Sequence, residues 1–115
     1  MLKSDRVRLQ HMVDAANEAL RSARERSRAD LDKDRVWALG LVKCVEIAGE
    51  AAARVGGSTK ARWSQIPWAE IVAMRNRLVH VYFDIDLDQV WKAVTEDLPP
   101  LVGELARILE ADTES

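Results

Sequence analysis

Cysteine and histidine are nearly missing from this sequence of 115 residues. The single cysteine, Cys44, cannot form a disulfide within the chain or build a cluster of thiolate metal ligands. The two histidines, His11 and His80, restrict a histidine-based metal site just as severely. We therefore expect the chain to hold no metal centre.

Long apolar runs are absent as well. The longest run covers residues 36–42 and is bounded by Arg35 and Lys43, whereas a bilayer span needs about 20 apolar residues. The first ten residues, MLKSDRVRLQ, mix charged with apolar side chains and lack the apolar core of a signal peptide. We expect no membrane segment and a cytoplasmic location.

Glycine and proline are also few, with 5 and 3 residues respectively. No segment shows the sustained alternation of polar and apolar residues that predicts a half-buried strand, and helix-forming residues dominate. Hydrophobic residues make up 48% of the chain, enough for one core. The sequence therefore predicts a single all-α domain over residues 1–115.

Four main helices are expected. They cover residues 4–24, 31–55, 67 to 80 or 82, and 87–110, with a charged turn at 24–30 and a short helical turn at 60–64. Ser4 or Asp5 is the expected N-cap of the first helix, and Pro67 suits the first position of the third. Pro99-Pro100 should kink or divide the last helix. The result is an antiparallel bundle of four to five helices.

Charge is unevenly distributed, although the net charge is only −2. Residues 1–28 carry a net charge of +3, residues 29–80 carry +2, and residues 81–115 carry −7. The acidic C-terminal part thus masks a mildly basic body. This pattern is compatible with an anionic ligand held locally, although a block of like charges is more often a solvated face.

Arg75 breaks the pattern of the third predicted helix. At about 100° per residue it lies within an apolar stripe formed by Trp68, Ile71, Val72 and Val79. Arginine keeps its charge, so a buried guanidinium needs a carboxylate, a phosphate or water. Three interpretations remain open, namely an anionic substrate, an ion pair with Glu46, Glu50 or Asp84, and an arginine whose stem packs while its head reaches solvent.

His80 follows Asn76 by one helical turn on the same prediction, so the amide could orient the imidazole. Histidine is the natural proton-transfer group near neutral pH, although a single histidine at a helix end is often structural. Arg75 and His80 are separated by about 140° around a straight helix. They could converge through the long arginine side chain, through a frayed helix end, or through a second subunit. A two-fold dimer that packs this helix against its twin would bring them together.

The segment RNRLVHVY, residues 75–82, matches the R-x4-H-x-Y signature of HepT-like toxins, a branch of the HEPN superfamily. The wider sequence also resembles that family in RLQHMVDAANEAL, VEIAGEAAARV, IPWAEIVAMRNRLVHVYFDIDLDQVW and EDLPPLVGEL. The resemblance covers nearly the whole chain. Two departures are Ala73 and Val81, where glycine is expected to be commoner.

The resemblance implies a metal-independent endoribonuclease toxin of a type VII-like toxin-antitoxin system, without a cofactor and active as a homodimer. Its antitoxin would be a minimal nucleotidyltransferase that transfers AMP to a tyrosine. Arg75 would hold the scissile phosphate, His80 would transfer the proton and Asn76 would orient it. Tyr82 would accept AMP. Arg77 could contact the RNA backbone, or could simply be a solvated arginine.

Other candidate groups fit structural roles better. The tryptophans Trp37, Trp63, Trp68 and Trp91 could stack on bases but are typical of a core. The alternating aspartates Asp84, Asp86 and Asp88 lack the glycine and glutamate of a calcium loop, so helix capping is favoured. The rival function is a non-catalytic HEPN module that binds nucleotide or serves as the regulatory subunit of a nucleotidyltransferase.

Overall fold

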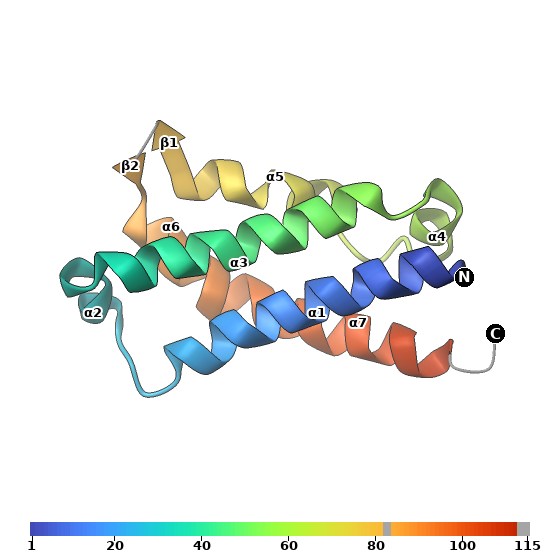
Figure 1. Ribbon diagram of the computed structural model, residues 1–115, viewed down its shortest axis with the longest axis horizontal. Helices are drawn as coiled ribbons and strands as arrows, with labels where there is room; N and C mark the ends of the chain where they lie inside the picture. Colours follow the sequence, from blue (N-terminus) through green and yellow to red (C-terminus); the bar gives the residue numbers. More distant parts are fainter. Residues whose placement is uncertain (82–83, 113–115) are drawn as a thin grey trace.

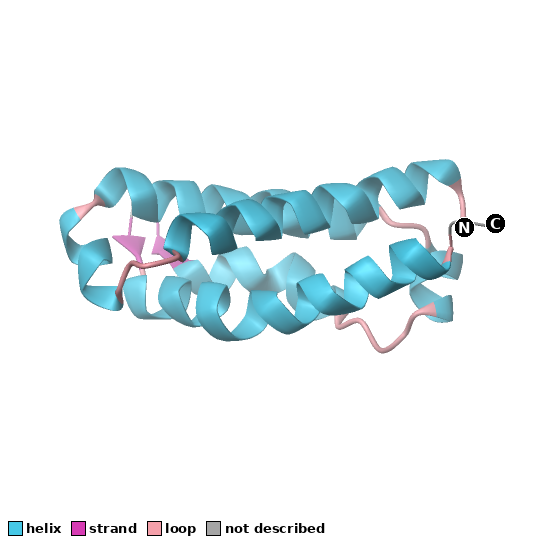
Figure 2. Ribbon diagram, turned by 90° about the horizontal axis from the view of Figure 1, so that it is seen from below, coloured by secondary structure: helices cyan, strands magenta, loops and turns pink. Residues whose placement is uncertain are grey.

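The computed structural model describes residues 1–81 and 84–112. The helices are α1 (Lys3–Ala23), α2 (Arg28–Lys33), α3 (Arg35–Arg54), α4 (Gly57–Arg62), α5 (Trp68–Leu78), α6 (Leu87–Lys92) and α7 (Leu98–Ala111), with a π-helical turn at Ala93–Asp97. A strand pair, β1 (Val79–Val81) and β2 (Asp84–Ile85), lies at one end of the bundle (Figure 2). The predicted all-α fold is confirmed.

The long helices run antiparallel along a molecule of 46 × 29 × 20 Å (Figure 1). Helix α1 packs against α3 and α7, and α3 packs against α5. Leucine, valine and alanine side chains from these helices and from α6 fill the core, among them Leu9, Leu41, Val45, Val90 and Leu105. No helix in the described part of the chain combines the length and apolar character that a membrane span requires.

Close contact between α3 and α5 fixes the position of the candidate site. A Cβ atom at Gly49 would lie only 3.1 Å from the backbone oxygen of Ile71, so glycine permits this approach. Ile71, Met74 and Leu78 of α5 are buried against the bundle. Arg75, which lies on the exposed side of α5, is therefore placed next to α3.

The sequence predicted one helix over residues 31–55, whereas the structure divides this segment between two helices, α2 and α3. Helix α2 begins at Arg28, where the Asp30 carboxylate accepts a hydrogen bond of 2.7 Å from the backbone of Ser27. Asp34 then ends α2 and caps α3, because its side chain accepts from the backbone N–H of Trp37 at 3.0 Å. The connecting turn is correspondingly shorter than predicted.

The N-cap prediction for the first helix is wrong, because Leu2 is the N-cap and both Ser4 and Asp5 lie inside α1, where Asp5 is buried. Its carboxylate accepts hydrogen bonds from the backbone of Gly56 at 3.0 Å and from the hydroxyl of Thr59 at 2.7 Å. The hydrogen bond from Thr59 is the main cause that lowers the pKa of the Asp5 carboxyl. Asp5 thus ties α1 to the start of α4.

The third helix is shorter than predicted at both ends. Pro67 is the N-cap of α5, and the helix ends at Leu78 rather than at residue 80 or 82. His80 lies in β1 between Val79 and Val81, β-branched residues that favour extended backbone. The backbone N–H of Asp86 donates to the carbonyl of Leu78 at 2.7 Å, so the returning chain satisfies a carbonyl at the helix end.

The last helical segment is interrupted near Pro99-Pro100, as predicted. The interruption is the π-helical turn Ala93–Asp97, which immediately precedes α7. The two prolines have no N–H to donate into the preceding turn, and the N–H of Leu98 instead reaches back to the carbonyl of Ala93. The helix therefore changes its hydrogen-bond spacing where proline removes the normal donors.

Candidate functional site

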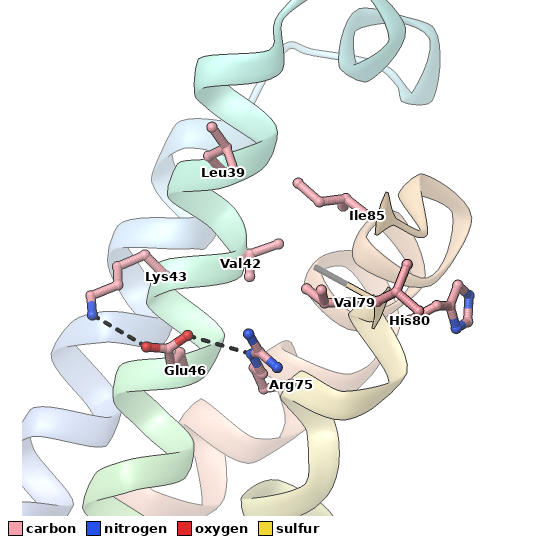
Figure 3. Close-up of a pocket in the computed structure, with 9 residues that line it drawn as sticks. Leu39, Val42, Lys43, Glu46, Arg75, Val79, His80 and Ile85 are labelled. Atoms are coloured by element: carbon pink, nitrogen blue, oxygen red, sulfur yellow. Dashed lines mark hydrogen bonds and ion pairs between the residues drawn. The ribbon is translucent and has the colours of Figure 1, made fainter. Parts of the chain in front are cut away.

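A cavity of about 490 Å³ opens between α3, α5 and the strand pair (Figure 3). Helix α3 supplies one wall, Arg75 comes from α5, and the other wall belongs to β1 and β2. The lining residues are Leu39, Val42, Lys43, Glu46, Arg75, Val79, His80, Val81 and Ile85. The cavity therefore combines apolar walls with three charged side chains and one imidazole, as small-molecule sites commonly do.

Arg75 is not buried as the helical wheel predicted. Its side chain is 45% exposed, and its Nε atom lies 3.5 Å from Oε2 of Glu46. The other oxygen of Glu46 accepts a hydrogen bond of 3.3 Å from Lys43 (Figure 3). The predicted stripe is wrong because α5 turns Val72 and Arg75 outward. Of the ion pairs considered, the one with Glu46 is present, and solvent reaches it.

His80 lines the same cavity from β1, with its side chain 55% exposed. Its Nε2 atom lies 2.8 Å from Oδ2 of Asp86. In the view of Figure 3 the imidazole extends away from Arg75, so the two groups flank the strand from different sides. One chain therefore presents the arginine and the histidine at one cavity without directing both at a common point.

Asp86 is the partner of His80 that the sequence did not indicate. Its Oδ1 atom accepts from the backbone N–H of Gln89 at 3.1 Å, so Asp86 also caps α6, as the capping interpretation predicts. The hydrogen bond with His80 is the main cause that lowers the pKa of the Asp86 carboxyl. The only signal in the sequence was the capping position, which does not reveal the imidazole contact.

Asn76 and Arg77 lie on different sides of α5. Asn76 shares with Arg75 an adjoining cavity of about 370 Å³ between α3 and α5. Arg77 instead lines a groove against Asp97 and Pro100. Because α5 ends before His80, the spacing of one helical turn that we expected between Asn76 and His80 does not exist. Tyr82, the predicted AMP acceptor, lies outside the described residues.

A third concave region continues across α3. It lies between α1 and α3, measures about 490 Å³, and includes Arg8, His11 and Arg54. It shares Glu50 with the cavity around Asn76. The three regions together run along a face on which several large apolar residues are exposed, namely Val7, Leu39, Ile47, Val72 and Val81.

Among the residues that the structure describes, no group of three or more histidine, cysteine, aspartate or glutamate side chains could hold a metal ion. Cys44 is half-buried, and desolvation raises the pKa of its thiol. The described groups at the cavity are therefore cations, a carboxylate and an imidazole.

The chain is similar in sequence to several proteins that are named as ribonucleases. A protein of Thermococcus cleftensis named "Probable ribonuclease HepT" is 35% identical over 75 residues, covering 65% of this chain and 68% of that protein. "Putative RNase TTE0752" of Caldanaerobacter subterraneus is 28% identical over 111 residues, covering 96% of this chain and 99% of that protein. "Putative RNase MJ1380" of Methanocaldococcus jannaschii is 28% identical over 97 residues, covering 84% and 89%.

No solved structure matches the chain significantly. The model of the family described as "Ribonuclease HepT-like" matches residues 12–108, which include α5, both strands and the cavity between them. The matched range exceeds half of the sequence and contains Arg75, Asn76 and His80. The chain therefore belongs to the HepT-like ribonuclease family of the HEPN type.

Proposed function

We propose that this protein is a metal-independent endoribonuclease in which Arg75 holds the scissile phosphate and His80 transfers the proton. The observation that carries the proposal is that both side chains line one open cavity, where Arg75 forms a solvent-accessible ion pair with Glu46. An RNA phosphate can take the place of that carboxylate, because both are anions that accept hydrogen bonds from a guanidinium.

RNA brings its own nucleophile, so the reaction needs only a cation and a proton-transfer group from the protein. The 2′-oxygen attacks phosphorus while its proton passes to His80, and the bond to the 5′-oxygen breaks to leave a 2′,3′-cyclic phosphate. Arg75 stabilises the negative charge that develops on the phosphoryl oxygens. We assign Asn76, which shares the adjoining cavity with Arg75, to the assembled site, and Arg77 to an RNA backbone phosphate.

A second copy of the chain completes the site in this proposal. The support is the direction of His80 away from Arg75 and the exposed apolar residues around the cavity, such as Leu39 and Val72. Packing this face against its two-fold mate would bury the apolar residues and bring Arg75 of one copy toward His80 of the other. A stable contact of this kind buries about 1,200–2,000 Å² in total.

The proposed function includes regulation by a partner protein. The chain would be the toxin of a type VII-like toxin-antitoxin pair in the cytoplasm, and a minimal nucleotidyltransferase would be its antitoxin. The antitoxin would transfer AMP from ATP to Tyr82, with the phenolic oxygen attacking the α-phosphorus and pyrophosphate leaving. Support comes from the family and from the sequence, which places Tyr82 two residues after His80.

The decisive experiment measures cleavage of a mixed-sequence RNA oligonucleotide in the presence of EDTA. We expect cleavage with 2′,3′-cyclic phosphate ends, and a loss of about 100-fold or more for Arg75→Ala and for His80→Ala. Arg107→Ala is the matched control, because Arg107 pairs with Glu104 on the surface of α7 and should retain the full rate.

Two results would contradict the ribonuclease proposal. Activity that EDTA abolishes and magnesium restores would show a metal-dependent reaction. Activity that is unchanged in both the Arg75 and the His80 variants would place the site elsewhere in the chain. A wild-type protein that binds ATP or AMP but cleaves no RNA would instead favour the non-catalytic nucleotide-binding subunit.

A further inference from the structure

The two oxygens of the Asp86 carboxylate have different partners. Oδ1 accepts from the backbone of Gln89 at 3.1 Å and caps α6, whereas Oδ2 lies 2.8 Å from Nε2 of His80. The side chain is only 28% exposed, although it is charged. A carboxylate that serves only as a helix cap needs one acceptor, so the second contact calls for its own explanation.

The backbone holds the carboxylate and the imidazole in register. Val79 is paired with Ile85 across the two strands, and the N–H of Asp86 donates to the carbonyl of Leu78 at 2.7 Å. His80 is thus flanked by residues bonded to the segment that carries Asp86. Because the Asp86 side chain is also fixed by Gln89, its free oxygen has a defined place next to the imidazole.

An ionised carboxylate can only accept a hydrogen bond, so the proton of this contact belongs to Nε2 of His80. The other ring nitrogen, Nδ1, then has a free lone pair in the neutral imidazole. The choice between two tautomers, which an isolated histidine leaves open, is made by the neighbouring carboxylate. The same carboxylate stabilises the ring when it becomes positively charged.

We propose that Asp86 is the positioning residue of His80, and that it holds the proton on Nε2 so that Nδ1 faces the RNA as the general base. The proposal rests on the ribonuclease function proposed above. Nδ1 takes the proton of the 2′-hydroxyl as the 2′-oxygen bonds to phosphorus, and it returns that proton to the 5′-oxygen as the bond to phosphorus breaks. Asp86 touches neither RNA nor the transferred proton.

The test compares Asp86→Asn with Asp88→Asn as the matched control. Asparagine remains a good helix cap, but its amide group donates toward Nε2 and moves the ring proton to Nδ1, where it blocks the general base. We expect kcat on the mixed-sequence RNA oligonucleotide to fall by about 100-fold or more with KM within about threefold. Asp88, which pairs with Arg28 on the surface, should tolerate the change.

Nitrogen-15 NMR of the imidazole provides a readout that a purely structural role would not move. The wild-type spectrum should show His80 protonated on Nε2, and the Asp86→Asn spectrum should show it protonated on Nδ1. If Asp86→Asn fails to fold, Asp86→Ser retains a capping hydroxyl and should lose the preference for the Nε2 tautomer. Thermal unfolding of each variant separates loss of the cap from loss of the imidazole contact.

The role of Asp86 and the ribonuclease function can fail separately. A wild-type kcat in Asp86→Asn, or a wild-type tautomer in both variants, would overturn the role of Asp86 and leave the ribonuclease function standing. A wild-type protein that cleaves no RNA would overturn the ribonuclease function and with it the catalytic purpose of Asp86. The tautomer measurement would then still show whether the carboxylate controls the ring.

Discussion

At the scale of single residues, Tyr82 is predicted to connect the cleavage site with its regulation. Co-expression with the cognate nucleotidyltransferase should raise the protein mass by one AMP group or a small multiple, and should suppress RNA cleavage. The added phosphate is an anion that can pair with Arg75 and occupy the place of the RNA phosphate. Mass spectrometry and the RNA assay measure both effects, and thermal stability should stay nearly unchanged.

Tyr82→Phe is the variant that isolates this modification. It lacks the oxygen that would bond to AMP, so it should cleave RNA at the wild-type rate and resist the nucleotidyltransferase. AMP on a different residue, or a silenced Phe variant that still gains mass, would refute the role of Tyr82. The ribonuclease activity would remain untouched by that result.

The candidate site could be predicted from the sequence only in part. Arg75 and His80 were identifiable as chemical groups, and both line the cavity. Their partners were harder to find, because Glu46 was one of three carboxylates within reach of Arg75. Asp86 reaches His80 only through the strand pair, and two or three residues per strand leave no alternating pattern in a sequence.

At the scale of helices, the buried carboxylate of Asp5 supplies a stability prediction. Asp5→Ala should lower the free energy of unfolding by about 2–4 kcal/mol, because it leaves the partly buried N–H of Gly56 and the buried hydroxyl of Thr59 without their acceptor. Urea denaturation at neutral pH measures the loss. Asp14→Ala, at an exposed position of the same helix, is the control and should change little.

The same contact should make stability depend on acid. Folding lowers the pKa of the Asp5 carboxyl, so its contribution is complete above the unfolded value of about 3.9 and is lost as the pH falls through the folded value. The difference between wild type and Asp5→Ala should therefore shrink below about pH 4. A difference that stays constant in acid would show that the carboxylate charge is irrelevant.

The helices themselves were largely predictable, because long amphipathic segments such as α1 and α7 carry a strong periodic signal. The errors lie where one residue outweighs that signal. Asp34 divides the second predicted helix because its side chain competes for the backbone N–H of Trp37. Asp5 has the residue type and the sequence position of an N-cap. Only the folded structure, in which Gly56 approaches its carboxylate, shows that Asp5 links α1 to the start of α4.

At the scale of the whole molecule, the proposed two-copy site predicts complementation. Mixing Arg75→Ala with His80→Ala subunits should restore about half of the wild-type activity per mixed dimer, because one of the two composite sites then has both residues intact. Subunits are mixed after mild denaturation and assayed on the mixed-sequence RNA oligonucleotide. Light scattering on the wild type should show a dimer at micromolar concentration.

A site contained within one chain gives a different result. Each mixed dimer would then contain two defective sites, and activity would stay at the level of the single variants. A monomer at micromolar concentration would likewise contradict the shared site. Val72→Glu places a charge on the exposed apolar face and should weaken the dimer without disturbing the monomer core, since Val72 is not part of that core.

The ion pair between Glu46 and Arg75 affects how strongly the proposed site would bind resting RNA compared with the transition state. A phosphodiester carries one negative charge, so replacing one singly charged anion by another on Arg75 gains little affinity for resting RNA. The pentacoordinate transition state carries more negative charge, and it attracts the guanidinium more strongly than the carboxylate does. With the proposed role of Arg75, the Glu46 carboxylate would weaken the binding of resting RNA and leave the transition state favoured.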